Sequence, residues 1–242
     1  MVGLLVTAIL ALLPAQAPPG AGPVPLRHVI FGVEVDVTTH TSQAQLSGDV
    51  GGAPDLSAAT HDRVSGTITV DVLEALPDGA LAIRISESAR NRATSPLTLG
   101  VMGDGALAMD EPTSARILPE EAALARLMAR QIVATHVVAA GSSWQMERHD
   151  QSDVRMHVRV IGEPGSTAHI AIDGSDASKR ADGARSTYSV DMMYAVEKTI
   201  PVEAAVESDL RNETSLASRH IQMRATYRLK DDSLKSPIRA VP

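Results

Sequence analysis

The chain has 242 residues, and 29 acidic against 22 basic side chains give it a formal net charge of −7. Proteins that bind nucleic acids present a basic surface to the phosphates and aromatic rings to the bases, so this charge and an aromatic content of 2% disfavour that class. The absence of cysteine excludes disulfides, thiolate nucleophiles and cysteine-held zinc or iron–sulfur centres. The chain is long enough to bury a sizeable core.

An apolar segment opens the chain. Residues 2–13 are interrupted only by Gly3 and Thr7, and Ala15-Gln16-Ala17 has the small-x-small pattern of a signal-peptidase site. The segment is shorter than the ~20 residues that cross a bilayer as a permanent helix. We therefore predict a signal peptide over residues 1–17 and an exported protein, periplasmic or secreted, with no permanent membrane span after cleavage. Because no basic residue precedes the segment, an atypical signal and a start codon further upstream both stay open.

Proline and glycine dominate the next segment. Residues 18–26 read Pro-Pro-Gly-Ala-Gly-Pro-Val-Pro-Leu. Proline removes hydrogen-bond donors and glycine raises the entropy of the chain, so this composition predicts an extended linker. We predict that a single β domain follows over residues 27–232 and that residues 233–242 form a C-terminal tail.

Apolar and polar side chains alternate along much of the predicted domain. In residues 29–37 the valines and Phe31 recur at every second position and alternate with Gly32, Glu34 and Asp36, which places them on one face of a strand. The same period of two recurs in residues 64–72, 81–85, 154–160, 168–172, 188–196, 200–206 and 221–229. One apolar and one polar face are typical of strands in antiparallel sheets.

Asp-Gly pairs stand beside these segments, at Asp78-Gly79, Asp104-Gly105, Asp173-Gly174 and Asp182-Gly183. Glycine after aspartate reaches the positive φ angles that tight hairpin turns require. We therefore predict a turn at each pair, so that consecutive strands pair with each other. The predicted fold class is mainly β: a curved antiparallel meander sheet, a half-barrel or open barrel, with one helix packed on its concave face.

Two segments break the strand rhythm. Residues 47–61 are rich in Gly, Ser, Ala and Asp and predict a long loop. Pro119-Glu120-Glu121 suits the start of a helix, because carboxylates there face the positive end of the helix dipole. Apolar side chains then recur at helical spacing at Leu124, Leu127, Met128 and Ile132 and predict a helix over residues 119–134. The apolar stripe favours packing against the sheet over binding to a partner.

The sequence holds no Gly-x-Ser-x-Gly elbow, no phosphate-binding loop and no His-Glu-x-x-His motif. With a five-residue loop, His157 and His169 would share the polar face of one hairpin with His169 opposite Arg159, but arginine beside them repels a cation. The pairs Glu34–Asp36 and Asp231–Asp232 are predicted to be solvated, since neither has an enclosing context that would separate their pKa values. We predict no catalytic residue, no metal site and no cofactor.

A predicted antiparallel meander with a helix inserted mid-chain, behind an export signal, resembles the bacterial half-barrel carriers of the lipoprotein-localisation type. The resemblance covers residues 27–232 at the level of element order, without a shared motif. It implies that acyl chains bind between a curved sheet and a helical lid. The apolar residues that would then line the cavity are Val33, Val35, Ile68, Val70, Ile83, Leu124, Leu127, Met128, Ile170, Val190 and Met192.

Three functions stay open at this point. The first is a non-enzymatic carrier of a lipid or other amphiphile on the apolar face of the sheet. The alternative is an envelope or secreted protein-interaction module with a filled core, whose partner would be an envelope protein. An enzyme is the third, and the sequence assigns it no catalytic residues. An internal cavity would favour the first function over the second, and an acid–base pair buried inside that cavity would favour the third.

Overall fold

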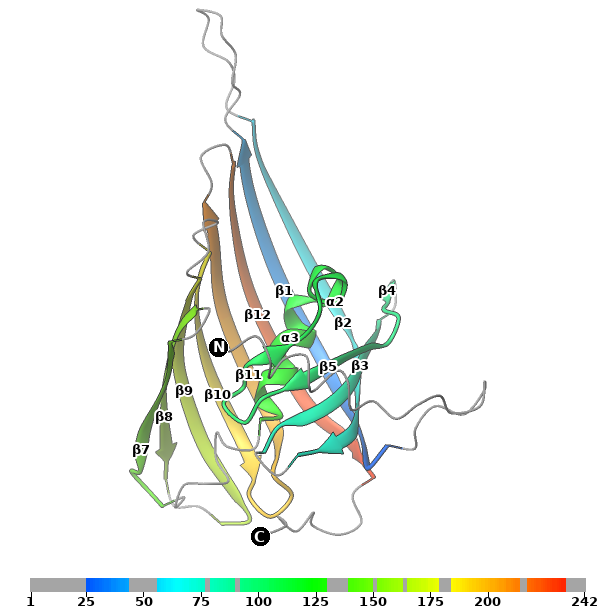
Figure 1. Ribbon diagram of the computed structural model, residues 1–242, viewed down its shortest axis with the longest axis vertical. Helices are drawn as coiled ribbons and strands as arrows, with labels where there is room; N and C mark the ends of the chain where they lie inside the picture. The colour runs from blue at the N-terminus through cyan, green and yellow to red at the C-terminus, as the bar shows by residue number, and fades with distance from the viewer. Residues whose placement is uncertain are drawn as a thin grey trace, which may run out of the picture.

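The structure is a computed structural model that describes residues 25–43, 56–76, 79–89, 92–129, 139–149, 152–162, 165–178, 184–213 and 217–233. Within these residues the chain forms one twelve-stranded antiparallel sheet and two short helices (Figure 1). The predicted signal peptide, most of the predicted linker and the predicted tail lie outside the described residues. Neither of the described helices is long and apolar enough to cross a bilayer.

The first half of the chain supplies β1 (Arg27–Gln43), β2 (Leu56–Ala75), β3 (Leu81–Ala89), β4 (Arg92–Ala93), β5 (Leu97–Val101) and β6 (Leu107–Ala108). The second half supplies β7 (Ser143–His149), β8 (Ser152–Ile161), β9 (Thr167–Ser178), β10 (Arg185–Ala195), β11 (Ile200–Glu213) and β12 (Ala217–Asp232). The strands lie in the order β6-β5-β3-β2-β1-β12-β11-β10-β9-β8-β7, and β4 pairs with β3 outside this path. The first and last strands therefore meet in the middle of the sheet.

The alternation of apolar and polar residues in the sequence corresponds to an alternation of buried and exposed side chains in the sheet. Along β12 every second residue from Ile221 to Tyr227 is buried, and the residues between them are exposed. Because one face of each strand is apolar, the sheet buries that face and leaves the other to water. The apolar faces merge into one hydrophobic core on the concave side. The predicted fold class, a mainly β antiparallel meander that is not closed, is confirmed.

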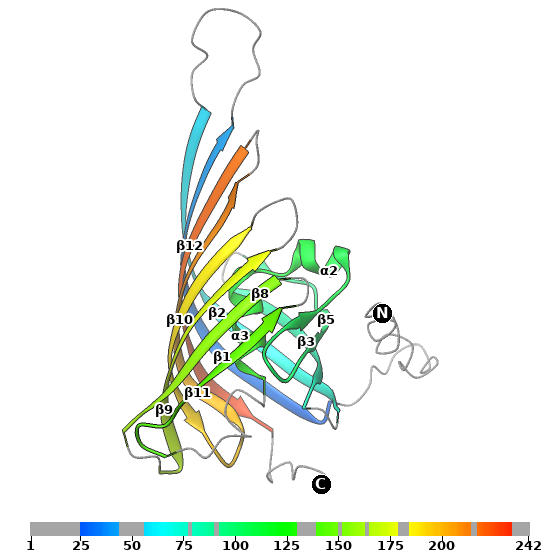
Figure 2. The same cartoon turned by 60° about the vertical axis from the view of Figure 1, so that its left-hand side comes forward.

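The helices lie between β6 and β7 in the chain and on the concave side of the sheet (Figure 2). Helix α3 (Pro119–Leu127) packs against the core through Leu124, which is fully buried. It ends well before the predicted residue 134. The N–H groups of Met128 and Ala129 each bond the carbonyl three residues back, at 3.1 Å, which tightens the last turn and closes the helix. Residues 130–138 lie outside the described part.

A second helix, α2 (Glu111–Arg116), was not predicted. Asp110 caps it, because its carboxylate accepts a hydrogen bond of 2.9 Å from the Thr113 N–H. Hydrogen bonding from the Thr113 side chain, and then from its backbone, lowers the pKa of Asp110. Pro112 occupies the first turn, where it costs no hydrogen bond. The helix is too short for apolar periodicity to reveal it from the sequence.

The long loop predicted over residues 47–61 is wrong for its second part. Leu56 to His61 belong to β2 and pair with β1, from Gln43 opposite Leu56 to Thr38 opposite His61. In this region β1, β2, β11 and β12 extend beyond the helices (Figure 1). The side chains of residues 57–63 are exposed on both faces of the strand. A strand with no buried face carries no apolar alternation, so the pattern was missing from the sequence.

The Asp-Gly pairs have different outcomes, and the pair Asp182-Gly183 lies outside the described residues. Gly79 and Gly105 have positive φ angles of 83° and 84°, as the predicted turns require. The turn predicted at Asp173-Gly174 is wrong, because both residues lie inside β9. Tyr188 of β10 pairs with Gly174, and a Cβ atom on Gly174 would stand 2.2 Å from the Cζ atom of the Tyr188 ring. The glycine makes room for a ring that lies across its strand.

We expect Gly174→Ala to lower the free energy of unfolding by about 1–3 kcal/mol, because the added methyl group pushes the Tyr188 ring out of place. The matched control is Gly165→Ala, since nothing lies within 4 Å of the position its Cβ would take. Urea denaturation of both variants measures the difference. Equal stability of the two variants would contradict the contact between Gly174 and the ring.

A buried ion pair joins the first residue of β1 to the last residue of β12. The guanidinium of Arg27 donates from Nε and Nη2 to the two carboxylate oxygens of Asp232, each at 2.9 Å, and from Nη1 to the carbonyl of Lys198 at 2.8 Å. The two side chains are 3% and 5% exposed. The prediction that the Asp231–Asp232 pair is solvated is therefore wrong for Asp232, whose partner is remote in the sequence.

Candidate functional site

A pocket of about 200 Å³ lies between α3 and the strands β8 to β12, and we call it the α3 pocket. Its α3 side is formed mainly by Pro119, Ala122, Ala123 and Leu127. Its sheet side consists mostly of inward-facing apolar side chains: Val154, Met156, Ile172, Val190, Val206, Leu210, Ile221 and Met223. The small side chains of Ala122 and Ala123 keep the helix from filling the space above the strands.

Charged side chains border the same pocket around the Tyr188 hydroxyl. Arg126 comes from the last turn of α3, Arg148 from β7 and Asp104 from the turn after β5. Arg148 Nη1 donates to Asp104 Oδ2 at 3.1 Å. Burial raises the pKa of the Tyr188 hydroxyl, while the charge of Arg126 acts in the opposite direction. The pocket thus joins an apolar cavity to a group of charges.

The Arg148–Asp104 bond also connects the two margins of the open sheet. Arg148 lies on β7, which is the strand at one margin, and Asp104 lies in the turn that joins β5 to β6 at the other. Asp104 is itself fixed, because its second carboxylate oxygen accepts the Ala106 N–H at 2.9 Å. The contact holds β7 and this turn together at the α3 pocket.

All the residues predicted to line an apolar cavity are buried on the concave side: Val33, Val35, Ile68, Val70, Ile83, Leu124, Leu127, Met128, Ile170, Val190 and Met192. Leu127 and Val190 border the α3 pocket. The others belong to the continuous hydrophobic core without bordering that pocket. Contact of any of these residues with a ligand stays a prediction.

Sequence reasoning missed the polar part of the pocket. Tyr188 stands at the head of a predicted strand, on the same face as Val190, so its inward direction was visible in the alternation. Arg126 stands between Leu124 and Leu127 of the predicted helix, and no motif in the sequence singles it out. Arg148 lies on β7, a strand that was not predicted because its residues are only partly buried.

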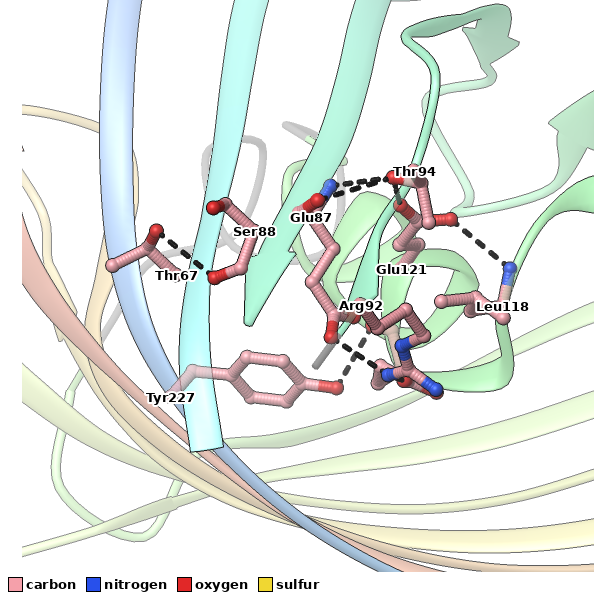
Figure 3. A network of polar contacts seen from close by, with 9 residues as sticks. Thr67, Glu87, Ser88, Arg92, Thr94, Leu118, Glu121 and Tyr227 are labelled. Carbon is pink, nitrogen blue, oxygen red and sulfur yellow. Dashed lines mark hydrogen bonds and ion pairs between the residues drawn. The ribbon is translucent and has the colours of Figure 1, made fainter. Parts of the chain in front are cut away.

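A second polar cluster lies between β3, β4 and the first turn of α3 (Figure 3). Arg92 donates to Glu87 Oε1 at 2.6 Å and also contacts the carboxylate of Glu120. Glu121 accepts hydrogen bonds from the Thr94 hydroxyl at 2.7 Å and from the Leu118 N–H at 3.0 Å. The three glutamates are buried. We call these contacts the Glu87–Arg92–Glu120 cluster.

The cluster fixes the start of α3 on the sheet. Tyr227 of β12 donates its hydroxyl to the backbone carbonyl of Glu120 at 2.9 Å. Burial raises the pKa of Glu120, and the nearby Glu87 carboxylate raises it further. Burial, with the charges of Glu120 and Glu87, also raises the pKa of Tyr227 well above its usual value. None of these side chains borders the α3 pocket, so this carboxylate pair is no acid–base pair inside that cavity.

The outer face of the sheet carries paired charges. The contacts between histidine and carboxylate side chains there include His61–Asp36 at 2.8 Å, His169–Asp191 at 2.8 Å and His220–Asp209 at 2.7 Å. The predicted position of His169 is wrong: it lies opposite Ile161, because Thr167 and Ala168 of β9 pair with β10 and not with β8. Among the described residues, no group of three histidine or carboxylate side chains could hold a metal ion.

Comparisons with known proteins add a distant likeness. No family model and no curated protein matches the chain. Among solved structures, a lipovitellin chain described for its lipid–protein interactions matches with a TM-score of 0.39 and 10% sequence identity. The match covers 91% of this chain and 26% of the lipovitellin chain, so this chain spans about a quarter of that protein's length. The predicted resemblance to lipoprotein-localisation carriers stays a prediction.

Proposed function

We propose that the protein is an exported, non-enzymatic carrier that holds the apolar part of an amphiphile in the α3 pocket. The observation that carries this proposal is the composition of the pocket, in which apolar side chains of five strands face small apolar residues of α3 and charges gather on one side. An apolar cavity with a few converging polar groups is typical of small-molecule sites. The export signal predicted over residues 1–17 supports a role outside the cytoplasm.

The size of the pocket favours a slender ligand. Its volume of about 200 Å³ lies below the ~300–1,000 Å³ of sites that enclose a drug-sized molecule. It therefore suits part of a single acyl chain. Leu210, which borders the pocket and is 36% exposed, offers apolar surface for the rest of such a chain. A protein-interaction module is the competing function, because most of the predicted cavity residues pack in a filled core.

Filling the pocket tests the proposal. We expect Ala123→Phe to weaken the binding of decanoate at least ten-fold, about 1.4 kcal/mol, because a phenyl ring at Ala123 occupies the space between α3 and the strands. The matched control is Ala115→Phe, the same substitution on an exposed position of α2. Isothermal titration calorimetry with decanoate measures the affinities of both variants and of the wild type.

The control separates occupancy of the pocket from a general effect of the aromatic ring. Thermal unfolding of Ala123→Phe should stay close to that of the wild type, because Ala123 is only partly buried. Decanoate binding that survives in a folded Ala123→Phe variant would move the ligand away from the α3 pocket. A wild-type protein that binds no amphiphile would leave the interaction module as the better function.

A further inference from the structure

The α3 pocket contains an arginine whose charge no other described residue neutralises. Arg126 borders the pocket, is partly buried, and forms no ion pair or side-chain hydrogen bond with the residues that the structure describes. The neighbouring Arg148 differs, because Asp104 binds it. A guanidinium beside apolar surface is poorly hydrated, so an anion that reaches it gains a strong, charge-assisted hydrogen bond.

The position of Arg126 on α3 has an ordinary explanation as well. A basic side chain in the last turn of a helix interacts favourably with the free carbonyls there, and such a residue needs no ligand. That explanation does not account for its place beside Tyr188 at the edge of an apolar cavity. Tyr188 borders the same space, and its hydroxyl can act as a second hydrogen-bond donor for an anion.

The other charges around Arg126 and Tyr188 determine whether the pocket favours a positive or a negative ligand. Asp104 is occupied by Arg148, and Asp176 acts on the Tyr188 hydroxyl from the neighbouring strand β9 but does not border the pocket. The free charge that faces the cavity is therefore the positive one of Arg126. Resting on the carrier function proposed above, we infer that the ligand is a single-chain amphiphile with an anionic head group, carboxylate or phosphate, that binds Arg126 and Tyr188 while its chain enters the α3 pocket.

Four probes with the same ten-carbon chain test the head group: decanoate, decyl phosphate, decanol and decyltrimethylammonium. We expect the two anions to bind the wild type about ten-fold more tightly than decanol, in line with a charge-assisted hydrogen bond, and the cation to bind most weakly. Tighter binding of decanoate than of decyl phosphate identifies a fatty-acid-like ligand, and the reverse identifies a phosphate-bearing one. Added salt should weaken only the binding of the anions.

Arg126→Gln removes the charge and keeps a polar, shorter side chain. We expect this variant to bind both anions about ten-fold more weakly than the wild type and to bind decanol with an affinity within about two-fold of the wild type. Arg126→Lys keeps the charge without the planar fork and should retain part of the preference. Thermal unfolding of each variant shows whether it is folded. Arg116→Gln on α2 is the matched control, because Arg116 is exposed and does not line the pocket.

The outcomes separate the head group from the carrier function. Equal binding of decanoate and decanol by the wild type, or unchanged anion binding by Arg126→Gln, would overturn the anionic head group and leave the carrier intact. Binding of the cation above the anions would also overturn it. A wild type that binds none of the four probes would overturn the carrier function and the head group together.

Discussion

Replacing Arg27 by methionine is expected to lower the free energy of unfolding by about 4 kcal/mol. The guanidinium makes two hydrogen bonds of 2.9 Å to Asp232 and one of 2.8 Å to the Lys198 carbonyl, and both side chains of the ion pair are nearly inaccessible to water. Removing one member of a buried ion pair leaves the other charge without its main compensation, which costs about 3–5 kcal/mol. Guanidinium chloride denaturation measures the loss.

Two further variants show that burial is the cause. Arg228→Met removes an arginine of β12 whose bond to Glu203 of β11, at 2.9 Å, is exposed to water. This variant should cost less than about 1 kcal/mol. The double variant Arg27→Met with Asp232→Leu should recover most of the loss, because no buried charge is left behind. If Arg27→Met were no less stable than Arg228→Met, the buried ion pair would not hold β1 against β12.

Replacing Arg92 by methionine is expected to cost about 3 kcal/mol, the low end of the range for a broken buried ion pair, because its side chain is 33% exposed. The change leaves Glu87 and Glu120 facing each other with side chains almost fully buried. The control is Arg84→Met, since Arg84 is 34% exposed but its partner Asp71 also accepts a hydrogen bond from His28. We expect Arg84→Met to cost about 1 kcal/mol.

The loss in Arg92→Met should depend on pH. Burial and the nearby Glu87 already raise the pKa of Glu120, so near its titration range the folded protein binds more protons than the unfolded chain. Stability then falls as the pH rises from the unfolded pKa of glutamate through the raised pKa of the folded state. Without Arg92 the pKa of Glu120 rises further. We therefore expect a larger loss at pH 8 than at pH 5, and a pH-independent loss would contradict the role of the carboxylate pair.

The sequence predicted most of the strands that have a buried face and missed the strand segments without one. Alternation placed Val33 and Tyr227 on the same side of the sheet because each strand has a period of two. Residues 57–63 have no buried face, and β6 is too short for a period to be counted. β5 was missed although Leu97, Leu99 and Val101 alternate with exposed or partly buried residues. The prediction of a turn at Asp173-Gly174 was wrong because a glycine fits a tight turn and also fits a strand position under an aromatic ring. Only the pairing of Gly174 with Tyr188 shows which of the two roles the glycine has.

The sites depend on contacts between distant segments, and these are invisible in a single sequence. Glu120 was assigned to the start of a helix, but its partners Glu87 and Tyr227 come from strands far away in the chain. The same holds for Arg148, which meets Asp104 only because β7 and the β5–β6 turn come together at the pocket. Composition and period predict which face of a helix or strand is apolar. They do not predict which other element packs against that face.

The strand order has a consequence for how the molecule is made. β1 and β12 are neighbours in the middle of the sheet, although they are the first and last strands of the described chain. During synthesis β1 to β6 and β7 to β11 can each form hairpins with strands already present, whereas β1 and β11 keep unpaired edges until β12 emerges. Exposed strand edges attract other chains. The growing polypeptide therefore needs β12 to cover the free edges of β1 and β11. A chain truncated before β12 would leave both edges exposed and is expected to aggregate.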